Sequence, residues 1–202
     1  MIDTKSISER ISAVPLTNGR RIIAVAGPPA SGKSTLSAAL EQEIDDACVV
    51  PMDGFHLSNE ELERQNLLSR KGAPQTFDVA GFSEVILALK ERGEVPFPIF
   101  DREQDCVIEG GSKVKETDTT IIVEGNYLLL DVAPWSALAS LWDLSVQISV
   151  PIDILKKRLI ERWIHHEHSQ DEAELRVARN DLPNAKFTLA HGLSADLTIS
   201  IE

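Results

Sequence analysis

The eight residues from Gly27 to Ser34, GPPASGKS, constrain the fold of this chain more than any other segment. They fit the pattern G-x-x-x-x-G-K-[ST] without a mismatch. A continuous apolar run at residues 21–26 comes directly before them, and an amphipathic helical pattern at residues 33–44 follows. This context predicts a loop between a buried strand and a helix, with backbone amides that bind phosphate groups.

The residue types in this loop explain the chemistry that we expect from it. The glycines allow the backbone to curl tightly, so that successive N–H groups point inward. Lys33 adds a full positive charge at the β- and γ-phosphates, and the Ser34 hydroxyl is suited to bind Mg²⁺. We therefore predict ATP and Mg²⁺ as ligands, with nucleotide contacts from Gly27, Ala30, Ser31, Gly32, Lys33, Ser34 and Thr35.

Short apolar segments alternate with helical patterns along the rest of the chain. Residues 96–114, which contain several prolines and glycines, are expected to form short strands or a hairpin. The alternation predicts an α/β protein with the three-layer P-loop NTPase fold, a mostly parallel sheet and helices on both faces. Strands are expected at 21–26, 48–50, 120–123, 144–150 and 195–201, and helices at 3–14, 33–44, 58–69, 82–92, 152–166 and 170–179.

Composition narrows the class of protein further. The 202 residues, 43% of them apolar, suffice for one domain with a core, so we expect a single domain over residues 1–202. The formal net charge of −12 disfavours a nucleic-acid partner. Two cysteines imply no disulfide framework. The first ten residues lack the apolar core of a signal peptide, and no apolar run approaches the length of a membrane span, so we expect neither. We expect a cytoplasmic protein without membrane insertion.

Two carboxylates follow predicted strands. Asp53 comes after residues 49–52, and Glu124 comes after residues 121–123. Ligands of open parallel sheets bind beyond the carboxyl ends of the strands. An acid at such a position commonly caps a helix or faces water. Beside a phosphate-binding loop, we favour a catalytic or metal-binding role for both acids. One acid can accept the proton of an attacking hydroxyl and the other can hold Mg²⁺.

Basic residues cluster in the helical pattern at 152–166. Arg158 and Arg162 are one helical turn apart and could stabilise charge on a transferring phosphoryl group, or they could lie on a solvated face. For Lys156 and Lys157 we favour the solvated face. Asp101 and Arg102 follow an apolar stretch and could bind the hydroxyls of an acceptor or form a surface ion pair.

Missing motifs indicate the branch of phosphate-loop proteins. The N-K-x-D motif of guanine-specific switches is absent from the sequence, and the D-x-x-G match at 78–81 lies in a polar loop. Glu124 is followed by Gly125, whereas ATP-driven motors usually place an Asp-Glu pair there. We therefore predict a kinase that phosphorylates a small-molecule alcohol. A nucleotide-binding regulator or transport accessory without a phosphoacceptor is the alternative.

Four further segments resemble the phosphoribulokinase/uridine kinase group, which also includes pantothenate and nicotinamide riboside kinases. These segments are VPMDGFH at 50–56, GAPQTFD at 72–78, FPIFDR at 97–102 and VEGNYLLL at 123–130. The resemblance extends from Ile22 to Ile199. Within the group it is closest to bacterial proteins labelled fructose-transport-system kinases, or fructokinase-like, which share residues 161–163, 180–185 and 195–197.

The resemblance implies a role for each matched position. Asp53 takes the position of the base, Glu124 that of the Mg²⁺-side carboxylate, and Arg158 and Arg162 those of lid arginines. It also implies a small helical lid at about 152–180, an acceptor-side insertion at about 95–118, and an N-terminal helix within residues 1–20. The implied catalytic residues are Lys33, Asp53, Arg158 and Arg162, and the implied acceptor contacts are Asp53, His56, Asp101 and Arg102.

The acceptor implied by the resemblance is a sugar or sugar-containing metabolite, with fructose suggested by the family label. A pantothenate- or nucleoside-type acceptor is the alternative. Residues 103–105, Glu-Gln-Asp, replace a His- and Arg-containing segment of uridine kinases, which speaks against uridine. Relatives include monomers and homodimers, so both states stay open, and Asn180 and Asn184 receive no role.

Overall fold

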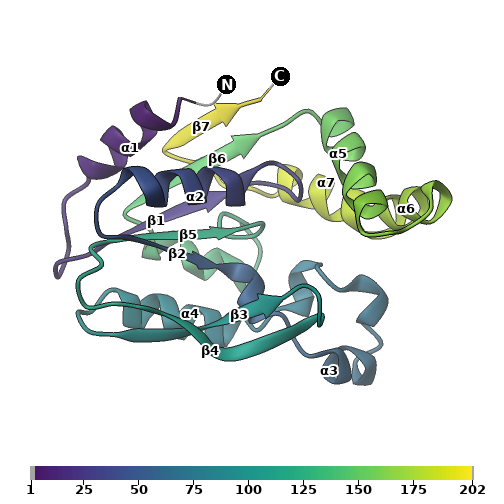
Figure 1. Ribbon diagram of the computed structural model, residues 1–202, viewed down its shortest axis with the longest axis horizontal. Coiled ribbons are helices and arrows are strands. Elements are labelled where there is room, and N and C mark those ends of the chain that lie inside the picture. The colour runs from purple at the N-terminus through teal and green to yellow at the C-terminus, as the bar shows by residue number, and fades with distance from the viewer. Residues whose placement is uncertain (1–2, 202) are drawn as a thin grey trace.

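The computed structural model describes residues 3–201, and its centre is a five-stranded sheet. The strand order is β2-β5-β1-β6-β7, and every pairing in this sheet is parallel. All five arrowheads point toward the side where α5 and α6 lie (Figure 1). The predicted α/β fold is therefore confirmed. The strands are β1 (Arg21–Ala26), β2 (Ala47–Pro51), β5 (Thr120–Gly125), β6 (Leu144–Ser149) and β7 (Leu197–Ser200).

Strand β1 explains why the sheet is covered on both faces. Successive side chains of a strand point to opposite faces, and successive residues of β1 belong alternately to two apolar clusters. Ile22 and Ala24 join one cluster, whereas Ile23 and Val25 join the other. All four side chains are buried, as expected for a strand that is apolar from Ile22 onward.

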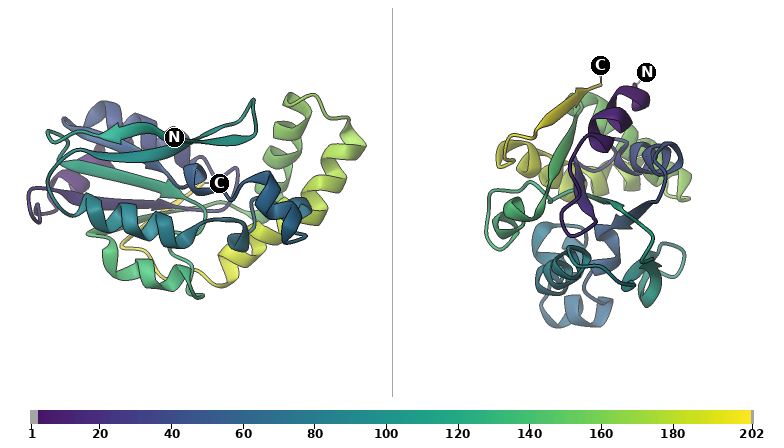
Figure 2. Two further views of the ribbon diagram at one scale, coloured as in Figure 1. Left: turned by 90° about the horizontal axis from the view of Figure 1, so that it is seen from below. Right: turned by 90° about the vertical axis from the view of Figure 1, so that its left-hand side faces the viewer.

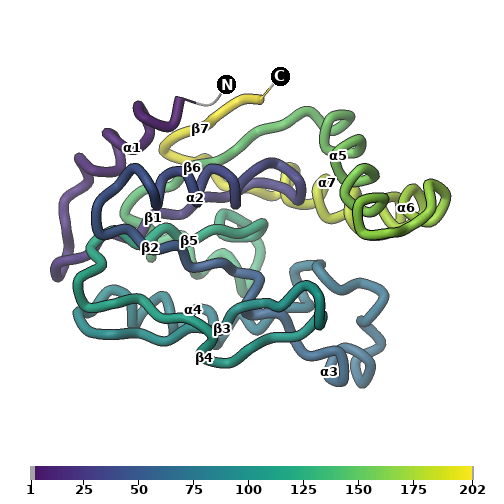
Figure 3. Tube along the Cα trace, in the orientation of Figure 1, coloured from purple at the N-terminus to yellow at the C-terminus, as the bar shows by residue number. Residues whose placement is uncertain are grey.

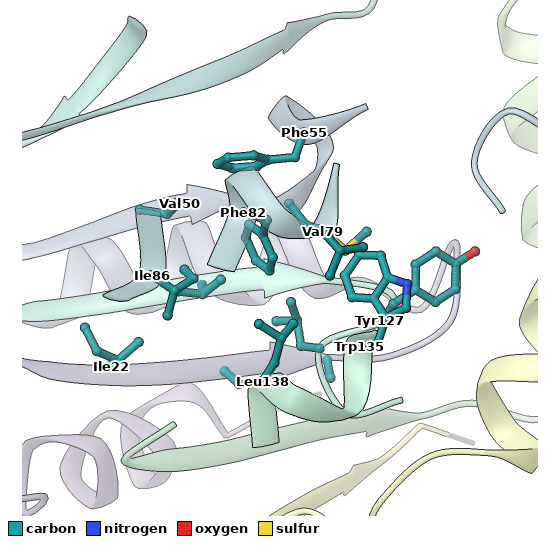
Figure 4. Packing of buried hydrophobic residues seen from close by; sticks show 14 of the residues in the cluster. Ile22, Val50, Phe55, Val79, Phe82, Ile86, Tyr127, Trp135 and Leu138 are labelled. Carbon is teal, nitrogen blue, oxygen red and sulfur yellow. The ribbon is translucent and has the colours of Figure 1, made fainter. Parts of the chain in front are cut away.

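The helices form the two outer layers. Helices α1 (Thr4–Ser12), α2 (Lys33–Glu43) and α5 (Ile152–His165) contribute buried residues to the cluster on one face. Helix α4 (Val79–Leu89) and the 3₁₀ segment η4 (Trp135–Leu141) cover the other face. Figure 4 shows Phe82, Tyr127 and Trp135 packed together there. Within residues 3–201, no helix combines the length and apolar character that a membrane crossing requires.

A hairpin lies outside the main sheet. Its strands β3 (Val95–Asp101) and β4 (Cys106–Val114) pair antiparallel, in agreement with the hairpin expected within residues 96–114. The base of the hairpin is attached to the sheet by Arg20, whose side chain is 1% exposed. Its guanidinium donates hydrogen bonds to the carbonyls of Glu91, Gly93, Lys115 and Asp118. These bonds fix the hairpin beside the amino end of β1.

Two predicted helix boundaries are wrong for local reasons. Helix α3 (Asn59–Arg64) ends five residues before the predicted Ser69, because Asn66 adopts a left-handed conformation and the Leu67 amide bonds back to Leu62. Helix α4 begins at Val79 because Asp78 caps it by accepting a hydrogen bond from the Gly81 amide. The D-x-x-G match at 78–81 is thus a helix cap.

The sequence patterns also missed a helix. The chain continues from α6 (Gln170–Arg176) through a π-helical turn, Val177–Asp181, directly into α7 (Leu182–Ala190). Pro183 follows the π-helical turn within this run, and it has no N–H to donate to the residues before it. Asn180 and Asn184 therefore belong to a continuous helical run that borders α5.

Candidate active site

The loop from Gly27 to Ser34 joins β1 to α2, as its motif predicts. Two of its residues have positive φ angles, Ala30 at 62° and Gly32 at 98°. Gly32 occupies the residue before the first turn of α2, where a left-handed backbone favours glycine. The loop therefore curls around the amino end of α2, where the helix dipole and free amides attract anions.

Lys33 and Ser34 begin helix α2 and reach two different partners. The Lys33 ammonium lies over the loop and donates a 3.1 Å hydrogen bond to the Pro28 carbonyl. Burial lowers its pKa, although the carboxylates of Glu124 and Asp53 oppose this shift. The Ser34 hydroxyl donates a 2.9 Å hydrogen bond to Glu124 Oε1. Both side chains are thus held close to the last residues of β5.

Glu124 lies at the carboxyl end of β5, opposite Val25 of β1 and Pro51 of β2. Its side chain is 9% exposed, and burial raises the pKa of its carboxyl, with Lys33 and Ser34 opposing the rise. Hydroxyl and carboxylate oxygens are the ligand types that Mg²⁺ takes from proteins. Ser34 and Glu124 together therefore have the donor chemistry of a magnesium site.

Asp53 is placed by the 3₁₀ turn η1 (Met52–Phe55), which directly follows β2. The turn lies so close to the hairpin that a Cβ atom on Gly54 would be 2.0 Å from the Pro98 carbonyl oxygen. Only glycine fits there, and this contact fixes Asp53 beside the hairpin turn. Arg102 of that turn donates a 2.5 Å hydrogen bond to Asp53 Oδ2.

Arg162 of α5 approaches the same place from the opposite side. Burial lowers the pKa of its guanidinium, and the neighbouring charge of Arg102 lowers it further. Arg158, one turn earlier, donates a 3.4 Å hydrogen bond to the Ala30 carbonyl of the loop. Lys157 instead pairs with Glu161 on the exposed face of α5, and Lys156 is also exposed.

Lys33, Ser34, Asp53, Arg102, Glu124 and Arg162 line one cavity of about 250 Å³, whereas Arg158 does not line it. In the tube trace the loop before α2, the turn of the hairpin and α5 all lie toward the end of the sheet at which its strands finish (Figure 3). The cavity contains three cations and two carboxylates within a chain whose formal net charge is −12. An anionic ligand is favoured there by the nearest charges. Nine of the predicted site residues line it: Ala30, Gly32, Lys33, Ser34, Thr35, Asp53, Arg102, Glu124 and Arg162.

Other predicted site residues lie near this cavity but do not line it. Gly27 and Ser31 lie deeper in the loop, and Ser31 is fully buried. Asp101 Oδ1 accepts 2.9 Å hydrogen bonds from the amides of Glu103 and Gln104, so this carboxylate stabilises the hairpin turn. His56 stacks on Phe77, with 4.1 Å between the ring centroids, and faces Phe100 on the hairpin.

Three lining residues were missed in the sequence: Pro29, Gly125 and Asn126. Gly125 and Asn126 come directly after Glu124, so the strand-end rule that found Glu124 also points to them. Pro29 lies within the loop motif at a position where the pattern accepts any residue. No sequence signal distinguishes it from its neighbours.

The buried His56 predicts a pH-dependent loss of stability. Burial lowers its pKa to about 4, and the Nδ1 atom is buried without a hydrogen-bond partner. Because the pKa in the folded state lies below 6.5, the unfolded chain takes up a proton first as the pH falls. The folded state therefore loses on the order of 2–3 kcal/mol between about pH 6.5 and 4 through this residue.

The variant His56→Phe keeps a ring between Phe77 and Phe100 but does not titrate. We expect its free energy of unfolding to fall less than that of the wild type between pH 7 and 4.5, as measured by urea denaturation. His165→Phe, on the exposed side of α5, is the control and should behave as the wild type. Equal losses in the wild type and His56→Phe would contradict the assignment.

Fold and site together define a P-loop nucleotide-binding protein, since the curled loop, the buried lysine and the strand-end carboxylates surround one cavity. The family model described as "Phosphoribulokinase / Uridine kinase family" matches residues 22–173, and the chain belongs to this family. It is a P-loop kinase of the group that includes uridine kinases, pantothenate kinases and phosphoribulokinase.

Similar proteins cover nearly the whole chain. The uncharacterized protein YggC of Escherichia coli (strain K12) is 36% identical over 205 residues, which cover 98% of this chain and 85% of YggC. A proposed uridine kinase of Schizosaccharomyces pombe is 31% identical over 194 residues, covering 89% and 83% of the two chains. The crystal structure of a proposed fructose transport system kinase from Silicibacter sp. TM1040 has a TM-score of 0.94 and 42% identity, covering 98% and 100%.

Proposed function

We propose that this protein transfers the γ-phosphate of ATP to a hydroxyl group of a sugar or sugar-containing metabolite. The observation that carries the proposal is the meeting of Lys33, Asp53, Arg102 and Arg162 in one cavity. A protein that only binds nucleotide needs the loop. It does not need a carboxylate placed beyond the loop with cations from two further elements around it.

Asp53 is the base in this proposal. It accepts the proton of the acceptor hydroxyl while the alcohol oxygen forms a bond to the γ-phosphorus. The bond between that phosphorus and the bridging oxygen breaks, and ADP leaves. Arg102, which binds Asp53 in the structure, would then contact the acceptor or the transferring phosphoryl group. Positioning and electrostatic stabilisation supply most of the rate in such reactions.

Ser34 and Glu124 would hold Mg²⁺ in this proposal. Within residues 3–201 no group of three or more His, Cys, Asp or Glu side chains could bind a metal ion. Mg²⁺ usually takes one or two protein ligands and completes its shell with phosphate oxygens and water. When bound, the ion would neutralise charge on the β- and γ-phosphates. The loop amides and Lys33 would hold the same phosphates from the protein side.

Helices α5 and α6 would form the lid over residues 152–180. Arg158 already contacts the loop at Ala30, and Arg162 enters the cavity, so both could neutralise charge that develops during transfer. On the other side, His56 and Asp101 would border the acceptor. The hairpin around residues 95–118 would form the acceptor-side wall.

The acceptor class is supported by family membership and by the similarity to a proposed fructose transport system kinase. We therefore rank fructose and related sugars first and pantothenate- or nucleoside-type alcohols second. Cytoplasmic location would supply the ATP.

A screen for ADP release tests the proposal. Candidate alcohols include hexoses, pentoses, nucleosides, pantothenate and glycerate, each with ATP and Mg²⁺ and a coupled assay. One class should accelerate ADP release, and mass spectrometry should detect an acceptor that has gained one phosphoryl group. If ATP turnover ignores every acceptor, the protein is better described as a nucleotide-binding regulator or transport accessory.

A further inference from the structure

Two cations reach the cavity from separate parts of the chain. Arg102 belongs to the turn of the hairpin, and Arg162 belongs to α5. Like charges repel, and each lies close enough to affect the other, since the charge of Arg102 lowers the pKa of Arg162. Asp53 offsets part of this repulsion inside the cavity, because it pairs with Arg102 and its charge also favours the charged form of Arg162. Contacts outside the cavity also hold the two elements in place.

The hairpin turn is held from outside by Lys71. Its ammonium donates hydrogen bonds to Asp105, at 2.9 Å to Oδ1 and at 3.1 Å to the carbonyl oxygen. A third bond of 2.7 Å reaches Asn59 Oδ1, and the ammonium lies 5.0 Å from the centre of the Phe100 ring. Asn59, the first residue of α3, also donates a 3.0 Å hydrogen bond to Asp105 Oδ2. Lys71 and Asn59 thus connect the hairpin turn to the segment around α3.

Lys71 is in turn held by Asn180, at the end of the π-helical turn between α6 and α7. The Asn180 amide nitrogen donates a 2.8 Å hydrogen bond to the Lys71 carbonyl. Its Oδ1 accepts from Asn184, whose own Oδ1 accepts from Arg70, both at 3.3 Å. Arg70 also donates to the Arg179 carbonyl. Both ends of the Asn180 amide are therefore used, which fixes its orientation.

The same π-helical turn is attached to α5. Asp181, the next residue, accepts a 2.7 Å hydrogen bond from the Trp163 indole, and Trp163 directly follows Arg162. Figure 2 shows the blue segment before α4 lying against the yellow-green α7. Neighbouring residues of one turn thus connect to both walls: Asn180 to the hairpin side and Asp181 to α5. π-Helical turns inside helices frequently occur at functional sites.

We infer that Asn180 is a positioning residue that fixes the spacing between Arg102 and Arg162 by acting through Lys71 and the hairpin turn. This inference rests on the proposed function in so far as the two cations serve phosphoryl transfer. The series of hydrogen bonds from Asn180 through Lys71 to Asp105 does not depend on the identity of the acceptor. The connection can therefore be tested with and without catalysis.

Hydrogen–deuterium exchange tests the connection in the protein without nucleotide. In Asn180→Ala, the amides of the hairpin turn, including those of Glu103 and Gln104, should exchange roughly 5- to 10-fold faster than in the wild type. The matched control is Arg179→Ala, which truncates an exposed side chain in the same π-helical turn and keeps its carbonyl. The control should leave exchange in the hairpin turn unchanged.

Kinetics with the acceptor found by the screen test the consequence. We expect Asn180→Ala to raise the KM for the acceptor roughly 5- to 10-fold and to change the KM for ATP by less than about twofold, because the loop that binds the nucleotide is not part of the chain of contacts. In a double-mutant cycle, adding Asn180→Ala to Asp105→Ala should change the KM for the acceptor very little. The reason is that both residues act through Lys71.

The two arms separate the two ideas. If Asn180→Ala exchanges faster at the hairpin turn but the wild type transfers no phosphoryl group, the structural connection is supported and the kinase proposal is rejected. Unchanged exchange at the hairpin turn, or equal losses for ATP and acceptor together with additive effects in the cycle, would reduce Asn180 to a residue that only stabilises the fold, and would overturn the inference.

Discussion

Replacing Asp53 with Asn is expected to lower kcat by about 10²–10⁴-fold, the range that a general base contributes. The amide keeps the shape of the carboxylate but cannot accept the proton of the attacking hydroxyl. Asp53 lies in η1, outside the loop that we propose binds the phosphates. The affinity for ATP should therefore stay within about twofold of the wild type.

Two measurements on Asp53→Asn are needed together. Turnover is measured with the acceptor from the screen, and the Kd for ATP by calorimetry with Mg²⁺ present. Asp45→Asn changes an exposed carboxylate in the turn after α2 and serves as the control. A parallel loss of ATP binding and turnover in Asp53→Asn would show that Asp53 does not act as the base.

Replacing Lys33 with Met is expected to weaken both nucleotide binding and transfer. Met retains most of the buried stem, but the charge near the β- and γ-phosphates is lost. Loss of one group that stabilises developing charge typically costs about 10²–10³-fold in kcat, or roughly 2.7–4 kcal/mol. The Kd for ATP should rise as well, which distinguishes this variant from Asp53→Asn.

The control for Lys33→Met is Lys156→Met, on the exposed face of α5. Thermal unfolding should show that Lys33→Met remains folded, because burial penalises the ammonium that it removes, as the lowered pKa of Lys33 indicates. Wild-type turnover and ATP affinity in a folded Lys33→Met would contradict a phosphate-binding role for the loop.

Two segments, 78–81 and 180–185, show what local sequence patterns cannot predict. Asp78 matches a nucleotide-switch motif by spacing, yet the structure uses it as a cap, because the motif does not encode which element follows it. Helix α7 was missed because a proline near the start of a short segment reads as a break. The role that we infer for the π-helical turn before α7 depends on contacts with residues 70 and 71, which are more than 100 positions away in the chain.

By itself, the sequence determined the parts of this protein that depend on neighbouring residues. The curled loop, the strand before it, the helix after it and the acids at two strand ends all follow from local spacing and from alternation of apolar residues. Only the tertiary structure decided that Arg102 pairs with Asp53, 49 positions away, and that Asn180 holds Lys71, 109 positions away. Such pairs depend on how the hairpin and the helices pack around the sheet, and that packing is the sum of many weak contacts distributed over the whole chain.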